Sequence, residues 1–135
     1  MTITQKRSDL GATRQTISIG KHTLIADMSV AEGGADEGPS PHDLYDAALA
    51  ACKALTVLWY ANKKGIPVGD MQTRVERDNS QERNGVYRLS ATLAIGGDVS
   101  DSQLKELESV AGKCPIHKLM TSITTEIDTV VERLP

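Results

Sequence analysis

Apolar and polar residues alternate along several short stretches of the chain, as they do in strands that bury one face. Residues 15–19 alternate in this way, and residues 21–28 follow them after a single glycine, so the two stretches predict an N-terminal β-hairpin. Residues 71–75 and 87–95 also alternate, and the polar turn 78–85 separates them. We therefore expect a second, central hairpin.

A long apolar stretch predicts a helix that begins at Pro41 and ends near Lys64. Ser40 suits the N-cap position, Asp43 supplies the acid of a short capping box, and Gly65 follows the last turn. Apolar residues cover most of the helix circumference, so we expect this helix to be central and buried. One side of it carries Leu44, Ala48, Ala51, Leu55, Leu58 and Trp59.

Two shorter helices are predicted towards the C-terminus. Ser100 and Gln103 have the spacing of a capping box ahead of an apolar pattern that ends at Gly112. Cys114 takes the N-cap position of a short helix that begins at Pro115. These helices follow the central hairpin directly.

A last alternating stretch, residues 123–131, predicts a closing strand. Strands are then grouped with strands and the helices lie between the groups. This order is typical of an α+β fold with antiparallel sheets. A chain of 135 residues has the length of one domain, so we expect a single domain over residues 1–135.

Composition excludes several classes of function. The net charge is −3 and aromatic residues make up 3% of the chain, so the protein lacks the positive charge and the stacking rings that bind nucleic acid. The most apolar stretch, residues 47–61, is interrupted by Lys53 and is too short to span a membrane. The N-terminus does not have the pattern of a signal peptide, and we expect a cytoplasmic protein.

The two cysteines have the most distinctive chemistry. Cys52 lies in the middle of the apolar helix, where both a core filler and a reactive thiol would fit. Cys114 lies at a predicted helix N-terminus beside Lys113, where free backbone N–H groups and a positive charge favour a thiolate. The helix N-terminus and the neighbouring lysine therefore predict more thiolate character for Cys114 than for Cys52.

Metal and cofactor binding are not predicted. Cys114 and His117 have only half of a zinc-binding motif, and the distant Cys52 and His42 do not complete its usual paired spacing. We expect His117 on the exposed side of its short helix. Glycine-rich phosphate loops and serine-hydrolase motifs are absent as well.

Three separated motifs together resemble the OsmC/Ohr family. They are Gly-Pro-Ser-Pro-His-Asp-Leu at 38–44, Ala-Ala-Leu-Ala-Ala-Cys at 47–52 and Cys-Pro-Ile-His-Lys at 114–118. The resemblance covers nearly the whole chain. It implies an intertwined homodimer with sites at the subunit interface and antiparallel hairpins around the cysteine-bearing helix. Characterised family members are thiol peroxidases that reduce organic hydroperoxides and, less efficiently, hydrogen peroxide.

The resemblance also implies roles for single residues. Cys52 would attack the peroxide and Cys114 would resolve the resulting sulfenic acid as a disulfide, which a dithiol such as a lipoylated protein then reduces. Arg14 is our candidate for the family arginine that assists the first cysteine. The Ohr branch has a Glu ten residues before that cysteine, where this chain has His42. His42 is therefore a candidate base, and Asp43 is a nearby acid.

An apolar pocket beside Cys52 would favour organic over aqueous peroxides. We expect its lining to come from one side of the helix, namely Leu44, Ala48, Leu55 and Trp59. Two other functions stay open at this point. One is a non-enzymatic dimer that binds an apolar small molecule, and the other is a thiol redox regulator with a protein partner.

Overall fold

The computed structural model describes residues 1–135 and divides into two compact units, Met1–Ala48 and Leu49–Pro135. Its order of strands and helices confirms the predicted α+β class. None of the helices has the length and apolar character needed to cross a membrane. The prediction of a single domain stays a prediction, and the two units are described in turn.

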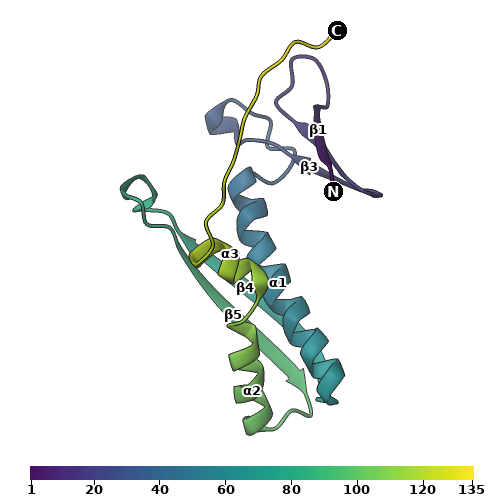
Figure 1. Ribbon diagram of the computed structural model, residues 1–135, viewed down its shortest axis with the longest axis vertical. Coiled ribbons are helices and arrows are strands. Elements are labelled where there is room, and N and C mark those ends of the chain that lie inside the picture. Colours follow the sequence, from purple (N-terminus) through teal and green to yellow (C-terminus); the bar gives the residue numbers. More distant parts are fainter. The chain divides into compact units, whose positions relative to one another are not determined.

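The first unit contains a three-stranded antiparallel sheet, coloured purple to blue in Figure 1. Its strands are β1 (Ile3–Arg7), β2 (Gln15–Ile19) and β3 (His22–Ala26), in that spatial order. The β2–β3 hairpin confirms the N-terminal prediction. Strand β1 was not predicted, because all five of its side chains are exposed and its sequence has no apolar alternation. The 3₁₀ helix η1 (Val30–Glu32) follows the sheet.

Helix α1 (Pro41–Lys64) has both of its predicted ends. The Ser40 N–H donates to Asp43 Oδ2 at 3.0 Å, and the Asp43 N–H donates to Ser40 Oγ at 3.1 Å. This reciprocal pair is a capping box made with aspartate. Gly65 follows the helix with a φ of +70°, a left-handed conformation that glycine adopts without strain.

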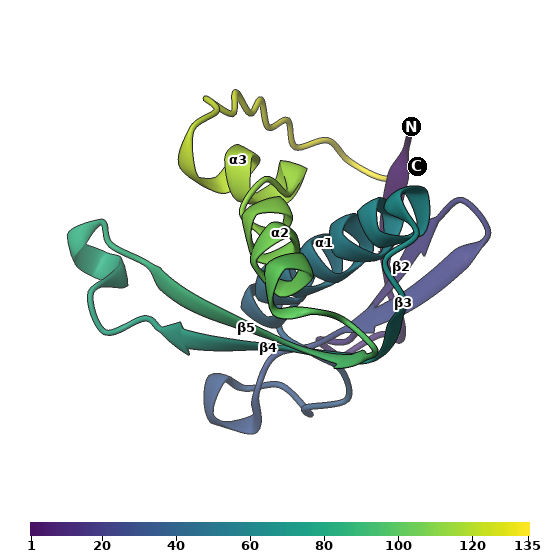
Figure 2. The same cartoon turned by 90° about the horizontal axis from the view of Figure 1, so that it is seen from below.

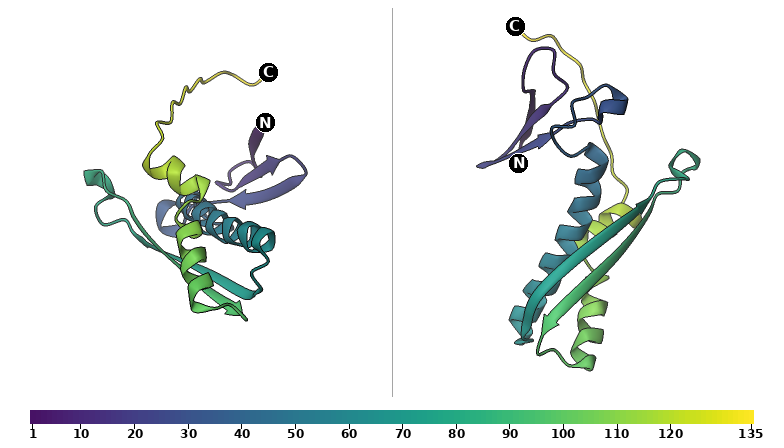
Figure 3. Two further views of the ribbon diagram at one scale, coloured as in Figure 1. Left: turned by 60° about the horizontal axis from the view of Figure 1, so that its bottom comes forward. Right: turned by 180° about the vertical axis from the view of Figure 1, so that it is seen from behind.

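The central hairpin consists of β4 (Val68–Asp78) and β5 (Arg88–Gly97), joined through the 3₁₀ helix η2 (Glu82–Asn84). Met71 lies opposite Ile95 and Asp78 lies opposite Arg88, so the predicted pairing is confirmed. The tip of this hairpin extends beyond α2 and α3 of the same unit (Figure 3).

Helices α2 (Asp101–Ala111) and α3 (Pro115–Thr121) complete the second unit. Helix α2 and the second-unit turns of α1 lie on the same face of the β4–β5 hairpin (Figure 2). The core there is formed by Val57, Ala61, Ile66 and Leu107, with Met71, Leu93 and Ile95 of the hairpin packed against it. Ser100 and Gln103 form the predicted capping box of α2.

The predicted closing strand is not present. Residues 123–131 have no regular secondary structure, and Figure 3 shows them as irregular coil. Ile127 and Val131 are 80% and 93% exposed. Alternation gives a segment one apolar face, but a strand also needs a neighbouring strand to satisfy its backbone groups. No strand of this chain pairs with the segment.

The prediction that α1 is buried around most of its circumference is also wrong. In the second unit the buried positions of α1 are Leu49, Lys53, Val57 and Ala61, which are spaced four residues apart. Leu55 and Trp59 are 65% and 63% exposed. The hairpin and α2 cover one face of the helix, so the other apolar face meets solvent in the single chain.

Candidate functional site

The second unit brings the two cysteines together. Cys52 is half-buried on α1, and its sulfur lies 4.0 Å from Thr56 Oγ1. Cys114 is fully buried at the N-cap of α3, and both cysteines are free thiols. The Cys52 thiol is close enough to Cys114 to raise its pKa, through a hydrogen bond between the two side chains and through charge repulsion. The two thiols therefore interact within one chain.

The ionisation of Cys114 differs from the prediction made from its N-cap position. The His117 N–H donates to Cys114 Sγ at 3.3 Å, which confirms the cap and lowers the pKa of the thiol. Burial has the larger effect and raises the pKa, because it disfavours the charged thiolate. The net pKa is above its ordinary value. Lys113, the cation predicted to assist, is exposed, and the lysine that lowers the pKa is Lys53.

Lys53 is the residue that sequence reasoning missed. Its side chain is buried in the second unit, where Nζ donates to Ala111 O at 3.0 Å and makes a hydrogen bond of 3.0 Å with His117 Nδ1. His117 is therefore half-buried and hydrogen-bonded to Lys53, and the prediction that it lies on the exposed side of its helix is wrong. The signal was present in the sequence: Lys53 is spaced four residues from Val57, at the helical interval of the core row.

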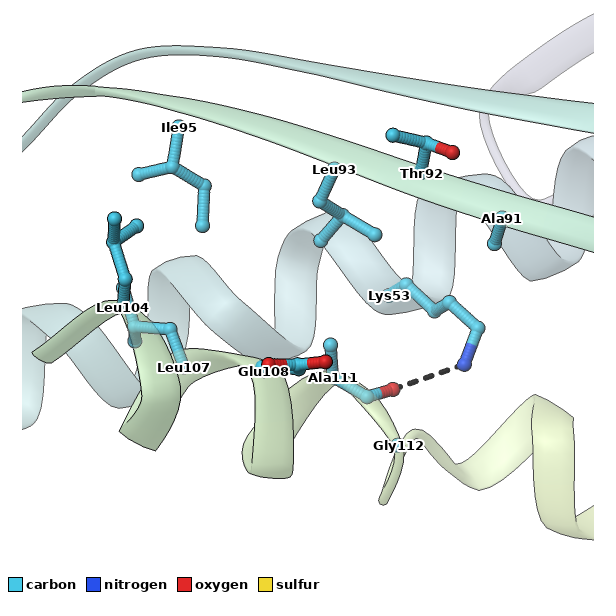
Figure 4. A pocket seen from close by; sticks show the side chains of 10 residues that line it. All are labelled: Lys53, Ala91, Thr92, Leu93, Ile95, Leu104, Leu107, Glu108, Ala111 and Gly112. Carbon is cyan, nitrogen blue, oxygen red and sulfur yellow. Dashed lines mark hydrogen bonds between the residues drawn. The ribbon is translucent and has the colours of Figure 1, made fainter. Parts of the chain in front are cut away.

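A cavity of about 450 Å³ lies between α1, β5 and α2 (Figure 4). Leu93 and Ile95 of β5 point towards Leu104 and Leu107 of α2, and Lys53 extends to the Ala111 carbonyl. The full lining is Lys53, Ala91, Thr92, Leu93, Ile95, Leu104, Leu107, Glu108, Ala111 and Gly112. The walls are mostly apolar, with one cation and one carboxylate.

A second hollow of about 540 Å³ opens at residues 112–114, the turn between α2 and α3 that we call the cysteine turn. Its lining includes Cys114 and His117, together with Lys113 and Lys118. The Lys53–His117 hydrogen bond joins a residue of the first cavity to a residue of the second. Cys114 thus borders this hollow, although the residue itself is fully buried.

Arg14 lies in the first unit, where two carboxylates hold it. Nη1 donates to Glu37 Oε2 at 2.7 Å and Nη2 donates to Asp9 Oδ2 at 3.3 Å. The Glu37 N–H in turn donates to Asp27, a buried carboxylate whose pKa is lowered chiefly by the Thr13 hydroxyl. The acid that accompanies Arg14 is therefore Glu37, which the sequence analysis did not single out.

The other predicted residues keep the status of predictions. His42 and Asp43 lie exposed in the first turn of α1. Leu55 and Trp59 are exposed and do not line the cavity of Figure 4, and the Lys63 ammonium lies 5.0 Å from the centre of the Trp59 ring. Groups of three or more His, Cys, Asp or Glu side chains suited to a metal ion are absent.

Comparison with known proteins agrees with this architecture. The model of the OsmC-like protein family matches residues 33–128, which include both cysteines. The chain belongs to the OsmC family. No curated protein matches it.

Solved structures of OsmC proteins share the fold at low sequence identity. An OsmC-like protein from Mycoplasma pneumoniae has a TM-score of 0.71 and 20% identity over 90% of this chain and 87% of its own. The organic hydroperoxide resistance protein OhrB of Bacillus subtilis has a TM-score of 0.58 and 22% identity over 90% of both chains. An organic hydroperoxide resistance protein OsmC from Legionella pneumophila has a TM-score of 0.62 and 20% identity over 90% and 88%.

Proposed function

We propose that this protein is a cytoplasmic thiol peroxidase that reduces organic hydroperoxides, and hydrogen peroxide less efficiently. One observation carries the proposal: the half-buried Cys52 lies close enough to the buried Cys114 to perturb its ionisation. The OsmC family includes organic hydroperoxide resistance proteins with the same fold, which supports the same class of substrate.

The proposed reaction begins at Cys52. Its thiolate attacks one peroxide oxygen, the O–O bond breaks, and the alkoxide takes up a proton and leaves as an alcohol. Cys52 is oxidised to a sulfenic acid, which is the reversible first product of thiol oxidation. In this proposal Arg14, held by Glu37, stabilises the Cys52 thiolate, and His42 and Asp43 are further candidates to assist.

Cys114 resolves the sulfenic acid in the second step. Its thiolate attacks the Cys52 sulfur, an S–S bond forms and the S–O bond breaks, and the hydroxide leaves as water with the Cys114 proton. An external dithiol then reduces the disulfide by exchange and is itself oxidised to a disulfide. A lipoylated protein is the candidate reductant. The hollow over Cys114 would give such a dithiol access to the sulfur.

We further propose that the working form is a homodimer. Leu55 and Trp59 leave an apolar face of α1 exposed, and the C-terminal segment exposes Ile127 and Val131. Exposed apolar surfaces of this kind are typical of interaction sites. A second copy of the chain would cover the helix face and could supply the strand that residues 123–131 lack.

Stopped-flow mixing with cumene hydroperoxide tests the enzymatic proposal. We expect the pre-reduced protein to consume the peroxide and to lose two thiols per chain, faster than with hydrogen peroxide. Cys52→Ser should abolish consumption, whereas Cys114→Ser should allow one turnover and retain a sulfenic acid. Non-reducing mass spectrometry should detect a Cys52–Cys114 link within one chain. Full peroxidase activity in Cys52→Ser would refute the assignment.

A second candidate function rests on the cavity of Figure 4. Its mostly apolar walls and volume of about 450 Å³ match a site for an apolar small molecule. In that case the protein would be a binding protein without peroxidase activity. A ligand that co-purifies with the protein, combined with thiol loss no faster than that of a free cysteine, would favour this function over the first.

A further inference from the structure

Lys53 has an unusual environment for a lysine. The residue is only 6% exposed, in a helix row whose neighbours in the second unit are apolar. A buried ammonium group is costly unless its charge is compensated and its donors are used. Here two donors are used, because Nζ binds the Ala111 carbonyl and the His117 ring. An ammonium can only donate, so a charged Lys53 requires His117 Nδ1 as the acceptor, with the proton of a neutral ring on Nε2.

These two bonds attach α1 to both sides of the cysteine turn. Ala111 is the last residue of α2 and precedes Cys114 by three positions, whereas His117 follows it by three in α3. The His117 N–H also donates to Cys114 Sγ at 3.3 Å. Lys53 itself is the chain neighbour of Cys52. One side chain therefore connects the backbone that carries the first thiol to the turn that carries the second.

The surroundings of Cys114 show which charge acts on it. The titratable or charged groups near Cys114 are Cys52 and Lys53 of α1, Lys113 of the turn, and His117 and Lys118 of α3, whereas Glu108 of α2 lines the neighbouring cavity. Among the groups that change the pKa of Cys114, Lys53 is the one cation, and it lowers that pKa against the effects of burial and of Cys52.

We propose that Lys53 is the positioning residue of the cysteine pair: its ammonium holds the Cys114 turn against α1 and stabilises the Cys114 thiolate that resolves the sulfenic acid. Its role in resolution rests on the proposed function, but its effect on Cys114 does not require peroxide. Lys53 would supply the positive charge that assists the attack of Cys114 on the sulfenic acid. It has no assigned role in the attack of Cys52 on the peroxide.

The test measures the ionisation of Cys114 directly. Cys52→Ser protein, prepared with isotope-labelled cysteine, has one cysteine, and the NMR shift of its β-carbon follows thiolate formation across the alkaline range. Adding Lys53→Met should leave less thiolate at a given pH, because the Lys53 charge lowers the pKa of Cys114. Adding Lys113→Met, an exposed lysine next to Cys114 in sequence, should leave the titration unchanged.

Two further variants separate charge from fold. Lys53→Arg keeps the cation and should keep the titration midpoint near that of Cys52→Ser, whereas Lys53→Gln keeps a donor without the charge and should raise the midpoint. They replace Lys53→Met if circular dichroism shows that it is unfolded. Equal midpoints for the Arg and Gln variants, or equal effects of Lys53→Met and Lys113→Met, would overturn the proposal.

A second readout connects Lys53 to resolution. After one equivalent of cumene hydroperoxide, Lys53→Met with both cysteines present should form the disulfide several-fold more slowly, with an unchanged rate of sulfenic acid formation. If the parent protein forms no sulfenic acid, the peroxidase proposal fails, while the titration still decides the role of Lys53. A normal titration together with a normal rate of disulfide formation would exclude any positioning role.

Discussion

Helix α1 carries two rows of side chains with opposite surroundings. Lys53, Val57 and Ala61 face the interior of the second unit, whereas Leu55 and Trp59 on the other side are 65% and 63% exposed. The buried row contains a charge, and the exposed row contains the largest apolar groups of the helix. Burial of a lysine beside exposure of a tryptophan is the reverse of the usual distribution.

The contrast shows that each row has a task beyond packing its own chain. Lys53 uses its ammonium to bind the Ala111 carbonyl and His117, which compensates its desolvation. Leu55 and Trp59 have no such compensation in the single chain, and a second copy would remove them from water. The helix would then hold the Cys114 turn with the row of Lys53 and carry the assembly on the row of Leu55 and Trp59.

Placing a charge in the exposed row should have the largest effect. In the proposed homodimer, Leu55→Asp would bury an unpaired carboxylate, and we expect dimer dissociation to become at least about 100-fold easier because that burial costs several kcal/mol. Sedimentation velocity over a range of concentrations measures the change. Asn79→Asp, in the exposed turn of the hairpin, makes a similar charge change and should leave the dimer intact. A dimer unaffected by Leu55→Asp would show that this row is not the interface.

Truncation in the buried row should affect folding. Val57 is fully buried, and Val57→Ala should lower the free energy of unfolding by about 2 kcal/mol, from lost burial and a new cavity. Val86 is 42% exposed in the hairpin turn, so Val86→Ala should change stability by less than about 0.5 kcal/mol. Urea titration at one protein concentration compares the two. Equal losses would mean that Val57 is not part of the core.

The elements that could be predicted from the sequence are those with local causes. The bounds of α1 follow from the Ser40–Asp43 capping box and from Gly65, and both involve residues within one turn of the helix end. The central hairpin follows from alternation on both sides of a polar turn. Each of these signals depends on neighbours in sequence, and each was confirmed.

The features that were missed depend on contacts between distant residues. Residues 123–131 alternate as a strand does, but the chain offers them no strand to pair with. Cys114 has its predicted N-cap, yet burial by the rest of the unit outweighs the local hydrogen bond. Lys53 was interpreted as a charge that interrupts an apolar stretch, because its partners lie 58 and 64 residues away. The candidate cysteine pair was predicted from sequence motifs. The lysine that contacts residues on both sides of Cys114 was found only from the hydrogen bonds of the structure.

The smallest expected effect is the pH dependence of stability that Cys114 contributes. Because burial raises the pKa of its thiol in the folded state, folding favours the protonated form. The contribution is therefore complete at pH values below the ordinary thiol pKa and is lost as the pH rises through the folded value. The free energy of unfolding of the reduced protein should fall in this range by at most about 1.4 kcal/mol per pH unit for this one group.

Comparison with Cys114→Ser isolates that contribution, since serine does not titrate there. Urea unfolding under reducing conditions, at successive alkaline pH values, gives a curve of the free energy of unfolding against pH for each protein. The two curves should converge as the pH rises, because only the parent loses the contribution of the Cys114 thiol. Parallel curves would mean that Cys114 ionises equally well in the folded and unfolded chains. The thiol would then be open to solvent, and the closed turn held by Lys53 would not describe the protein in solution.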